Sequence, residues 1–167
     1  MEIARDKYLE GLIARKHNGL VKVVTGIRRC GKSYLLFNLF RKHLQRAGVS
    51  EDHIISAQLD LRSARNLRDP DAMLDYVNNH IVDSEMHYVL LDEVQLLPDF
   101  VEVLNDLLAA SNIDPYVTGS NSRFLSNDVI TEFRGRGDEI HVFPLTFAEF
   151  MQTRNDEPFH AWADYAE

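Results

Sequence analysis

Apolar residues along this chain follow two alternating patterns. Short runs rich in β-branched residues, such as LVKVVT at 20–25, are typical of strands. Between these runs, apolar residues recur three and four positions apart, as they do over 32–46, which is typical of a helix with one buried face. We predict strands at 20–25, 53–61, 88–91, 116–118 and 139–143. We predict helices at 3–14, 32–46, 70–81 and 101–110.

The order of these segments predicts an α/β fold. Strands that alternate with helices form a mainly parallel sheet, because each parallel connection needs a crossover. The YVLL run at 88–91 is apolar at every position, which is typical of a central strand covered on both faces. Asp69 and Pro70 predict the start of the third helix, and Gly48 predicts the end of the second. No repeat or linker interrupts the 167 residues, so one domain is expected.

Composition excludes several classes of protein. The chain is 45% hydrophobic and 26% charged, which is ordinary for a globular domain with one core. No apolar run is long enough to span a membrane, and the charged start MEIARDKYLEG does not fit a signal peptide, so we expect a cytoplasmic protein. The single cysteine cannot form an internal disulfide or a cysteine-based metal site. The seven histidines lack the spacing of a metal site and are interpreted as structural or exposed.

Charge is unevenly distributed along the chain. The net charge of -8 argues against nucleic-acid binding through the overall field of the domain. Residues 1–50, however, carry 11 Lys and Arg against 3 Asp and Glu, whereas residues 51–167 carry 7 against 23. A basic first third fits a phosphate-binding end, although Arg41, Lys42 and Arg46 also fit the solvated face of a helix.

A phosphate-binding loop is the strongest motif. Gly26, Gly31, Lys32 and Ser33 complete the pattern G-x-x-x-x-G-K-[ST] between a predicted strand and a predicted helix. Glycines let backbone N–H groups turn toward a phosphate, and the helix N-terminus adds partial positive charge. Lys32 is expected to reach the β- and γ-phosphates, and the Ser33 hydroxyl to bind Mg²⁺. The predicted nucleotide-binding segment comprises Gly26, Ile27, Arg28, Arg29, Cys30, Gly31, Lys32, Ser33 and Tyr34.

Two further interpretations concern this loop. Arg28 and Arg29 fit solvent exposure as well as they fit contact with phosphate. Cys30 is interpreted simply as a small loop residue.

An acidic pair follows the third predicted strand. A rigid strand that ends in a carboxylate is what phosphate chemistry needs beside such a loop, and here it delivers Asp92 and Glu93. Asp92 is predicted to hold Mg²⁺ together with Ser33. Glu93 is predicted to orient and deprotonate the attacking water, which favours hydrolysis over storage of the nucleotide. The alternative is a solvated pair at a strand end.

Other polar segments supply weaker candidates. In TGSNS at 118–122, Asn121 is the first choice for a contact with the γ-phosphate or the water, Ser120 is the second, and a plain turn or helix cap is the alternative. Arg134 and Arg136 could stabilise transition-state charge in cis or for a neighbouring subunit, or be surface arginines. The predicted catalytic residues are Lys32, Glu93, Asn121 and Arg136, and the predicted metal ligands are Ser33 and Asp92.

Five segments in this order resemble a known family. VVTGIRRCGKSYLL, YVLLDEVQLLPDF, YVTGSNSRFL, FRGRG and HVFPLTFAEF are similar to segments of prokaryotic AAA-type ATPases that carry a further C-terminal domain. The resemblance implies a P-loop NTPase three-layer sandwich, with a mainly parallel five-stranded sheet of order 5-1-4-3-2 and helices on both faces. It also implies ATP as ligand, Mg²⁺ as cofactor, Asn121 or Ser120 as sensor 1, and Arg136 as the arginine of a Gly-Arg pair.

The chain departs from this family in two places. It stops after 161–167, where such proteins continue into a helical lid and the extra domain. The resemblance therefore implies that 1–167 is an ATPase core domain and an N-terminal fragment of a longer protein. Phe100 stands where a tryptophan is common, which concerns packing alone.

Three functions remain open from the sequence. The leading hypothesis is hydrolysis of ATP to ADP and phosphate with Mg²⁺, coupled to a conformational change on an unknown partner. The alternatives are a nucleotide-dependent switch or scaffold with little hydrolysis, and a P-loop small-molecule kinase. The chain has no N-K-x-D segment, so a GTPase is not expected. Expected partners are the nucleotide, further copies of the chain, and a protein or nucleic acid bound through a C-terminal region, but not a membrane.

Overall fold

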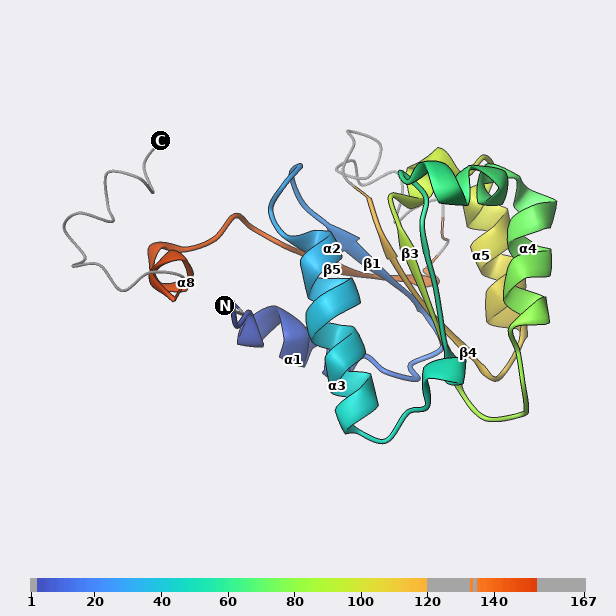
Figure 1. Cartoon of the computed structure of the whole chain (residues 1–167), viewed down its shortest axis with the longest axis horizontal. Coiled ribbons are helices and arrows are strands. Elements are labelled where there is room, and N and C mark those ends of the chain that lie inside the picture. The colour runs from blue at the N-terminus through green and yellow to red at the C-terminus, as the bar shows by residue number, and fades with distance from the viewer. Residues whose placement is uncertain (1–2, 120–132, 134, 153–167) are drawn as a thin grey trace.

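Five parallel strands form the centre of the molecule (Figure 1). A computed structural model describes residues 3–119, 133 and 135–152. The strands are β1 (Val21–Thr25), β2 (Ile54–Gln58), β3 (His87–Asp92), β4 (Ile113–Thr118) and β5 (Gly137–His141). They lie in the order β2-β3-β4-β1-β5, and every neighbouring pair is parallel. The fold class and the sheet order expected from the sequence are confirmed.

Helices cover both faces of this sheet (Figure 1). The helices are α1 (Asp6–Ala14), α2 (Lys32–Tyr34), α3 (Arg41–Arg46), α4 (Pro70–Asn79), α5 (Phe100–Ala109) and α8 (Phe147–Met151). A π-helical segment, η1 (Leu35–Phe40), joins α2 to α3, and short 3₁₀ helices are η2 (Glu51–His53), η3 (Arg62–Arg68) and η4 (Val94–Leu96). No helix among these described residues is long and apolar enough to span a membrane.

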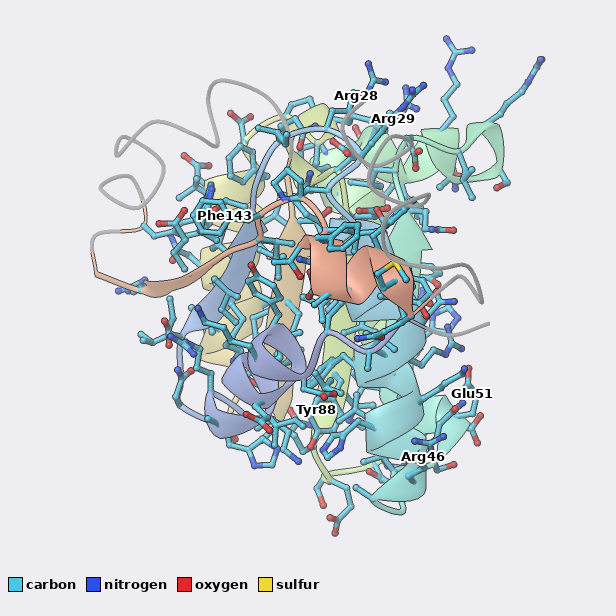
Figure 2. The ribbon with its side chains drawn as sticks, turned by 90° about the vertical axis from the view of Figure 1, so that its left-hand side faces the viewer. Arg28, Arg29, Arg46, Glu51, Tyr88 and Phe143 are labelled. Atoms are coloured by element: carbon cyan, nitrogen blue, oxygen red, sulfur yellow. The ribbon has the colours of Figure 1, made fainter. Side chains whose placement is uncertain are left out.

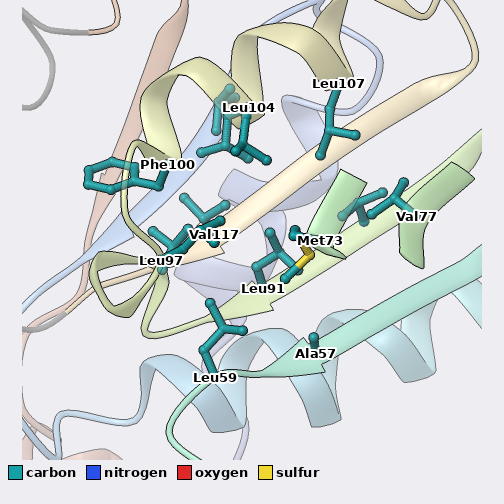
Figure 3. Packing of buried hydrophobic residues seen from close by; sticks show 14 of the residues in the cluster. Ala57, Leu59, Met73, Val77, Leu91, Leu97, Phe100, Leu104, Leu107 and Val117 are labelled. Carbon is teal, nitrogen blue, oxygen red and sulfur yellow. The ribbon is translucent and has the colours of Figure 1, made fainter. Parts of the chain in front are cut away.

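Two apolar clusters lie on opposite faces of the sheet. On one face, α1 and the helix from α2 to α3 pack on the strands, with Leu36, Phe40 and Leu90 fully buried. On the other face, α4 and α5 pack on the alternate strand positions, as Figure 3 shows for Met73 and Leu104. Every residue of β3 is buried, and the side chains of residues 88–91 point alternately into the two clusters. The prediction of a doubly covered central strand is confirmed.

The predicted helix ends agree with the local chemistry. The Asp69 carboxylate accepts a hydrogen bond from Ala72 N–H at 2.9 Å, and Pro70 is the first residue of α4. Gly48 follows α3 with a φ of +91°, a conformation that glycine adopts without strain. The α2–η1–α3 helix spans the predicted range 32–46, although the sequence did not reveal its π segment.

A charged pair is buried within the sheet. The Lys22 ammonium of β1 donates to the Asp114 carboxylate of β4 and to Leu20 O at 2.7 Å, and both charged side chains are almost inaccessible to solvent. The Tyr116 hydroxyl and the His17 N–H also donate to Asp114, at 2.8 and 3.1 Å. Burial lowers the pKa of Lys22, and the hydrogen bond and charge of Asp114 oppose that shift. This pair makes the start of β4 polar, where the sequence pattern predicted no strand.

Candidate functional site

The loop between β1 and α2 follows a path that only glycine permits at two positions. Gly26 has a φ of +141°, and a Cβ atom there would collide with the Val142 carbonyl oxygen. Gly31, the residue before α2, has a φ of +94°. Arg29, between them, is also left-handed at +65°. The backbone is therefore shaped by its own residues into the tight turn that a phosphate-binding loop requires.

Lys32 is directed into this loop. Its side chain is buried, and the ammonium donates hydrogen bonds to Gly26 O at 3.0 Å and Ile27 O at 2.9 Å. A lysine at this position of a P-loop contacts the β- and γ-phosphates of a nucleotide. The ammonium lies across the loop's own carbonyl groups, so it is already held within the turn rather than extended into solvent.

The two predicted metal ligands meet at the carboxyl end of the sheet. The Ser33 hydroxyl donates to Asp92 Oδ1 at 3.0 Å, although the residues are far apart in sequence. Asp92 is 3% exposed, and burial raises the pKa of its carboxyl group, while hydrogen bonds from Thr118 and Ser33 oppose the shift. A desolvated carboxylate beside a hydroxyl is a donor set that fits Mg²⁺ bound to a phosphate.

Glu93 adopts a backbone conformation that is unusual for its residue type. Its φ and ψ are +52° and +47°, in the left-handed region that residues with a side chain rarely occupy. Its N–H donates to Thr118 Oγ1 at 3.0 Å, and its carboxylate accepts a hydrogen bond from Gln95 Nε2. Such strain persists where surrounding contacts impose it, and it is concentrated at functional sites.

Thr118 is a residue of this site that the sequence did not single out. Its buried hydroxyl donates to Asp92 Oδ1 and accepts the Glu93 N–H, so one side chain fixes both members of the acidic pair. The register explains the contact, because β4 lies between β3 and β1 and ends beside both. The sequence placed Thr118 at the start of TGSNS, but favoured Asn121 and Ser120 as its functional residues.

Arg5 is a second residue that sequence reasoning missed. Its side chain is 1% exposed, and Nη1 donates to Cys30 O in the phosphate loop at 2.6 Å. Nη2 donates to Phe143 O at 2.8 Å, and Nε to Glu149 Oε1 at 3.1 Å. One buried guanidinium therefore connects the start of the chain, the phosphate loop and the segment that follows β5. The sequence around Arg5 contains no pattern that predicts these contacts.

Glu149 couples this arginine to the start of α8. Its second carboxylate oxygen accepts the Thr146 N–H at 2.8 Å, and Thr146 Oγ1 accepts the Glu149 N–H at 3.2 Å. These two bonds form a capping box, for which T-x-x-E in FPLTFAEF is the sequence signal. The same side chain thus begins α8 and neutralises Arg5.

The remaining predicted residues of the loop lie around its rim or beneath it. Ile27, Arg28 and Arg29 are exposed, and Figure 2 shows both arginines at one end of the molecule, pointing away from the ribbon. Cys30 is buried in the apolar cluster under α1, so it contributes to the core as well as being small. The Tyr34 hydroxyl accepts the Ile3 N–H at 3.1 Å and so contacts the start of the chain.

Arg136 is not brought together with the phosphate loop of its own chain. It immediately precedes β5, whose first residue pairs with Val21 at the amino end of β1, whereas the loop follows the carboxyl end of β1. The Arg136 guanidinium is exposed and donates to Asn105 Oδ1 at 3.4 Å. Ser120, Asn121, Arg134 and the segment 161–167 lie outside the described residues.

Known proteins are similar in sequence to most of this chain. A profile of the AAA domain family matches residues 18–151. An uncharacterised protein of Haemophilus influenzae is 33% identical over 154 residues, which cover 92% of this chain and 38% of that protein. An uncharacterised protein of Methanocaldococcus jannaschii is 30% identical over 138 residues, which cover 81% and 29%. The chain therefore spans well under half the length of these relatives.

Solved structures share the fold at low sequence identity. Cdc6p from Pyrobaculum aerophilum aligns with a TM-score of 0.65 and 14% identity, over 99% of this chain and 50% of that one. A DNA polymerase III gamma subunit-related protein from Thermotoga maritima aligns with a TM-score of 0.62 and 9% identity, over 92% and 51%. At such identities the likeness concerns the fold alone.

Proposed function

Because this chain belongs to the AAA family of P-loop ATPases, we propose that it binds ATP with Mg²⁺ and hydrolyses it to ADP and phosphate. The observation that carries the proposal is the contact between Ser33 and Asp92 at 3.0 Å, directly beside Glu93. This contact places a hydroxyl and two carboxylates next to a loop shaped for phosphate. The spacing of the motifs along the sequence supports the same function.

The residues of the loop bind and neutralise the nucleotide in this proposal. Lys32 exchanges its bonds to Gly26 O and Ile27 O for the β- and γ-phosphate oxygens. Ser33 and Asp92 would hold Mg²⁺, which neutralises charge that develops on the phosphates. Thr118 keeps Asp92 in place for this role through its hydrogen bond.

Glu93 acts on the attacking water. Its carboxylate releases Gln95, orients the water in line with the γ-phosphorus, and accepts a proton as the new P–O bond forms. The bond between the γ-phosphorus and the bridging oxygen breaks, and that oxygen leaves with ADP. Asn121 or Ser120 is proposed to contact the γ-phosphate or the water from the end of β4.

Neighbouring subunits and a partner are part of the proposal. Arg136 is exposed and remote from its own phosphate loop, so we propose that it serves the site of an adjacent copy rather than its own. The curated relatives extend well beyond the aligned region. We propose that the nucleotide state reaches a protein or nucleic-acid partner through such an extension, by way of Arg5, Glu149 and α8.

A nucleotide-dependent switch with little hydrolysis is the second candidate. The hydrogen bond from Gln95 to the Glu93 carboxylate favours it, because a base that is already bonded must first be released. In that case the protein would bind MgATP tightly and respond to it, and Glu93→Gln would leave the response unchanged.

The test is phosphate release from MgATP in the absence of any acceptor. We expect turnover in the wild-type chain, nucleotide binding without turnover in Glu93→Gln, and loss of binding in Lys32→Ala. Binding without release in the wild type would support the switch instead. Release that survives Glu93→Gln would refute the assignment of the base, and phosphate transfer only to an added small molecule would indicate a kinase.

A further inference from the structure

Two histidines and an aspartate meet at the amino ends of β2 and β3. His53 immediately precedes β2, His87 is the first residue of β3, and Asp83 lies in the loop that leads to β3. Each offers a ligand atom within 4.8 Å of the other two. The centroids of the two imidazole rings lie 4.6 Å apart. They are close because Ile54 pairs with Tyr88, and this register makes His53 and His87 neighbours across the strands. The cluster is thus at the opposite end of the sheet from the phosphate loop.

Hydrogen bonds fix the protonation pattern of His87. Its ring is fully buried, and Nδ1 lies 2.8 Å from Glu85 O, an acceptor, so Nδ1 must carry the hydrogen. Nε2 is then the nitrogen with the free electron pair, and it accepts the Val82 N–H at 3.2 Å. A backbone carbonyl on the other ring nitrogen is the arrangement that orients metal-binding histidines. A group that binds Nε2 would have to displace this N–H, which belongs to a residue that is 57% exposed as a whole.

The aspartate is also positioned by its neighbours. Asp83 Oδ1 accepts the Glu85 N–H at 2.8 Å, and Asp83 O accepts a hydrogen bond from Asn112 Nδ2 at 3.3 Å. Both carboxylate oxygens lie 3.0 Å from His53 Nε2. The loop is therefore held with its carboxylate against the imidazole, and the carboxylate remains open to solvent on its outer side.

We propose that His53, Asp83 and His87 bind a divalent transition-metal cation such as Zn²⁺. Two imidazole nitrogens, one carboxylate oxygen and a water supply the four ligands that Zn²⁺ takes in tetrahedral sites with an open position. The cation replaces the hydrogen that His53 Nε2 shares with Asp83 and displaces the Val82 N–H from His87. Imidazole ligands select Zn²⁺, Co²⁺ or Cu²⁺ over Mg²⁺, which prefers oxygen, so the cation of the nucleotide site does not compete.

Bound metal would tie three elements together at this end of the sheet. It would join the start of β2, the start of β3 and the loop after α4. A ligand that binds only the folded state raises stability by mass action, so Zn²⁺ should raise the unfolding temperature. A hundredfold excess over Kd predicts an increase of at least about 5 °C for a domain of this size.

The experiment is a titration of the full 167-residue chain, without a polyhistidine tag, with Zn²⁺ by calorimetry and with Co²⁺ by visible absorption. The variants are His53→Ala and Asp83→Asn, and the matched control is His80→Ala, an exposed histidine outside the cluster. Asp92→Asn is included so that metal at the nucleotide site is not mistaken for this one. We expect the wild type, His80→Ala and Asp92→Asn each to bind one equivalent of metal. With Co²⁺, the absorption should be typical of tetrahedral coordination.

Loss of a ligand should weaken binding by more than about tenfold, the smallest effect seen when an outer-shell partner of a metal site is removed. His87 is left intact because its buried ring holds the loop. If His53→Ala does not fold, Asp83→Asn carries the test, since that carboxylate is exposed. Absence of stoichiometric binding in the wild type, or equal affinity in Asp83→Asn and His80→Ala, would overturn the proposal.

Discussion

Replacing Arg5 with methionine tests whether the start of the chain holds the phosphate loop in place. Methionine keeps the apolar stem of the side chain but removes the guanidinium that bonds to Cys30 O, Phe143 O and Glu149. Removing one partner of a buried ion pair costs about 3–5 kcal/mol, because the other charge is left uncompensated. Glu149 is 16% exposed and keeps its bonds to Thr146, so we expect the lower end, about 3 kcal/mol.

The loop should also lose affinity for nucleotide. Cys30 O is held by the 2.6 Å bond to Arg5, and in the proposed complex this bond would help to hold the neighbouring N–H groups toward the phosphates. A loss of about 1.4 kcal/mol in preorganisation corresponds to a tenfold rise in Kd. We expect this rise for ATP and ADP alike, because the contact does not involve the γ-phosphate.

The assays are urea unfolding, which reports the free energy of unfolding, and calorimetry with MgADP, which reports nucleotide affinity. Arg5→Lys is the matched control, since it keeps the charge but cannot make the same planar set of bonds, and it should fall between wild type and Arg5→Met. Glu149→Gln combined with Arg5→Met completes a double-mutant cycle for the pair. A loss of stability below about 1 kcal/mol in Arg5→Met, with unchanged affinity, would refute the reasoning.

Three other substitutions follow from the geometry. Lys22→Met leaves Asp114 buried without its cation, so it should lower the free energy of unfolding, measured in urea, by about 3–5 kcal/mol. A smaller loss in the double variant with Asp114→Leu would identify the unpaired charge as the cause. Gly26→Ala places a methyl group against Val142 O at a positive φ, so it should abolish nucleotide binding in calorimetry and destabilise by at least about 2 kcal/mol. Thr118→Val keeps the shape of the side chain but removes the hydroxyl that joins Asp92 and Glu93. Phosphate release should therefore fall at least about tenfold while the protein stays folded. Unchanged release would show that the contact is incidental.

Local patterns predicted most of the elements and the centre of the site. Burial of a strand or helix face has a period that is visible over a few residues, so the runs at 20–25 and 88–91 were assigned correctly. The phosphate loop was also predictable from a short segment, since its two glycines are required by the backbone conformation of six consecutive residues. The order of the strands in the sheet was predicted instead from the resemblance of five segments to AAA-type ATPases, because no local pattern specifies which strands are neighbours.

The start of β4 shows where local patterns mislead. Asp114 and Pro115 disfavour a strand, and the sequence therefore predicted one only from residue 116. In the folded chain β4 begins at Ile113, which pairs with His87 of β3, and Lys22 from another strand neutralises Asp114. A partner that lies 92 positions away cannot be read from the segment itself.

Hydrophobic periodicity in the sequence was enough to predict most of the strands and helices, and local motifs were enough to predict the loop and acidic pair of the candidate nucleotide site. The distant side chains that complete this candidate site are brought together by packing, since Arg5 meets Glu149 and Thr118 meets Asp92 across the fold. It also brought His53, Asp83 and His87 together, although their spacing along the chain predicted no metal site. The reason is that hydrophobic periodicity reports burial, which is a property of each segment, whereas a hydrogen bond or a ligand set depends on how separate segments pack.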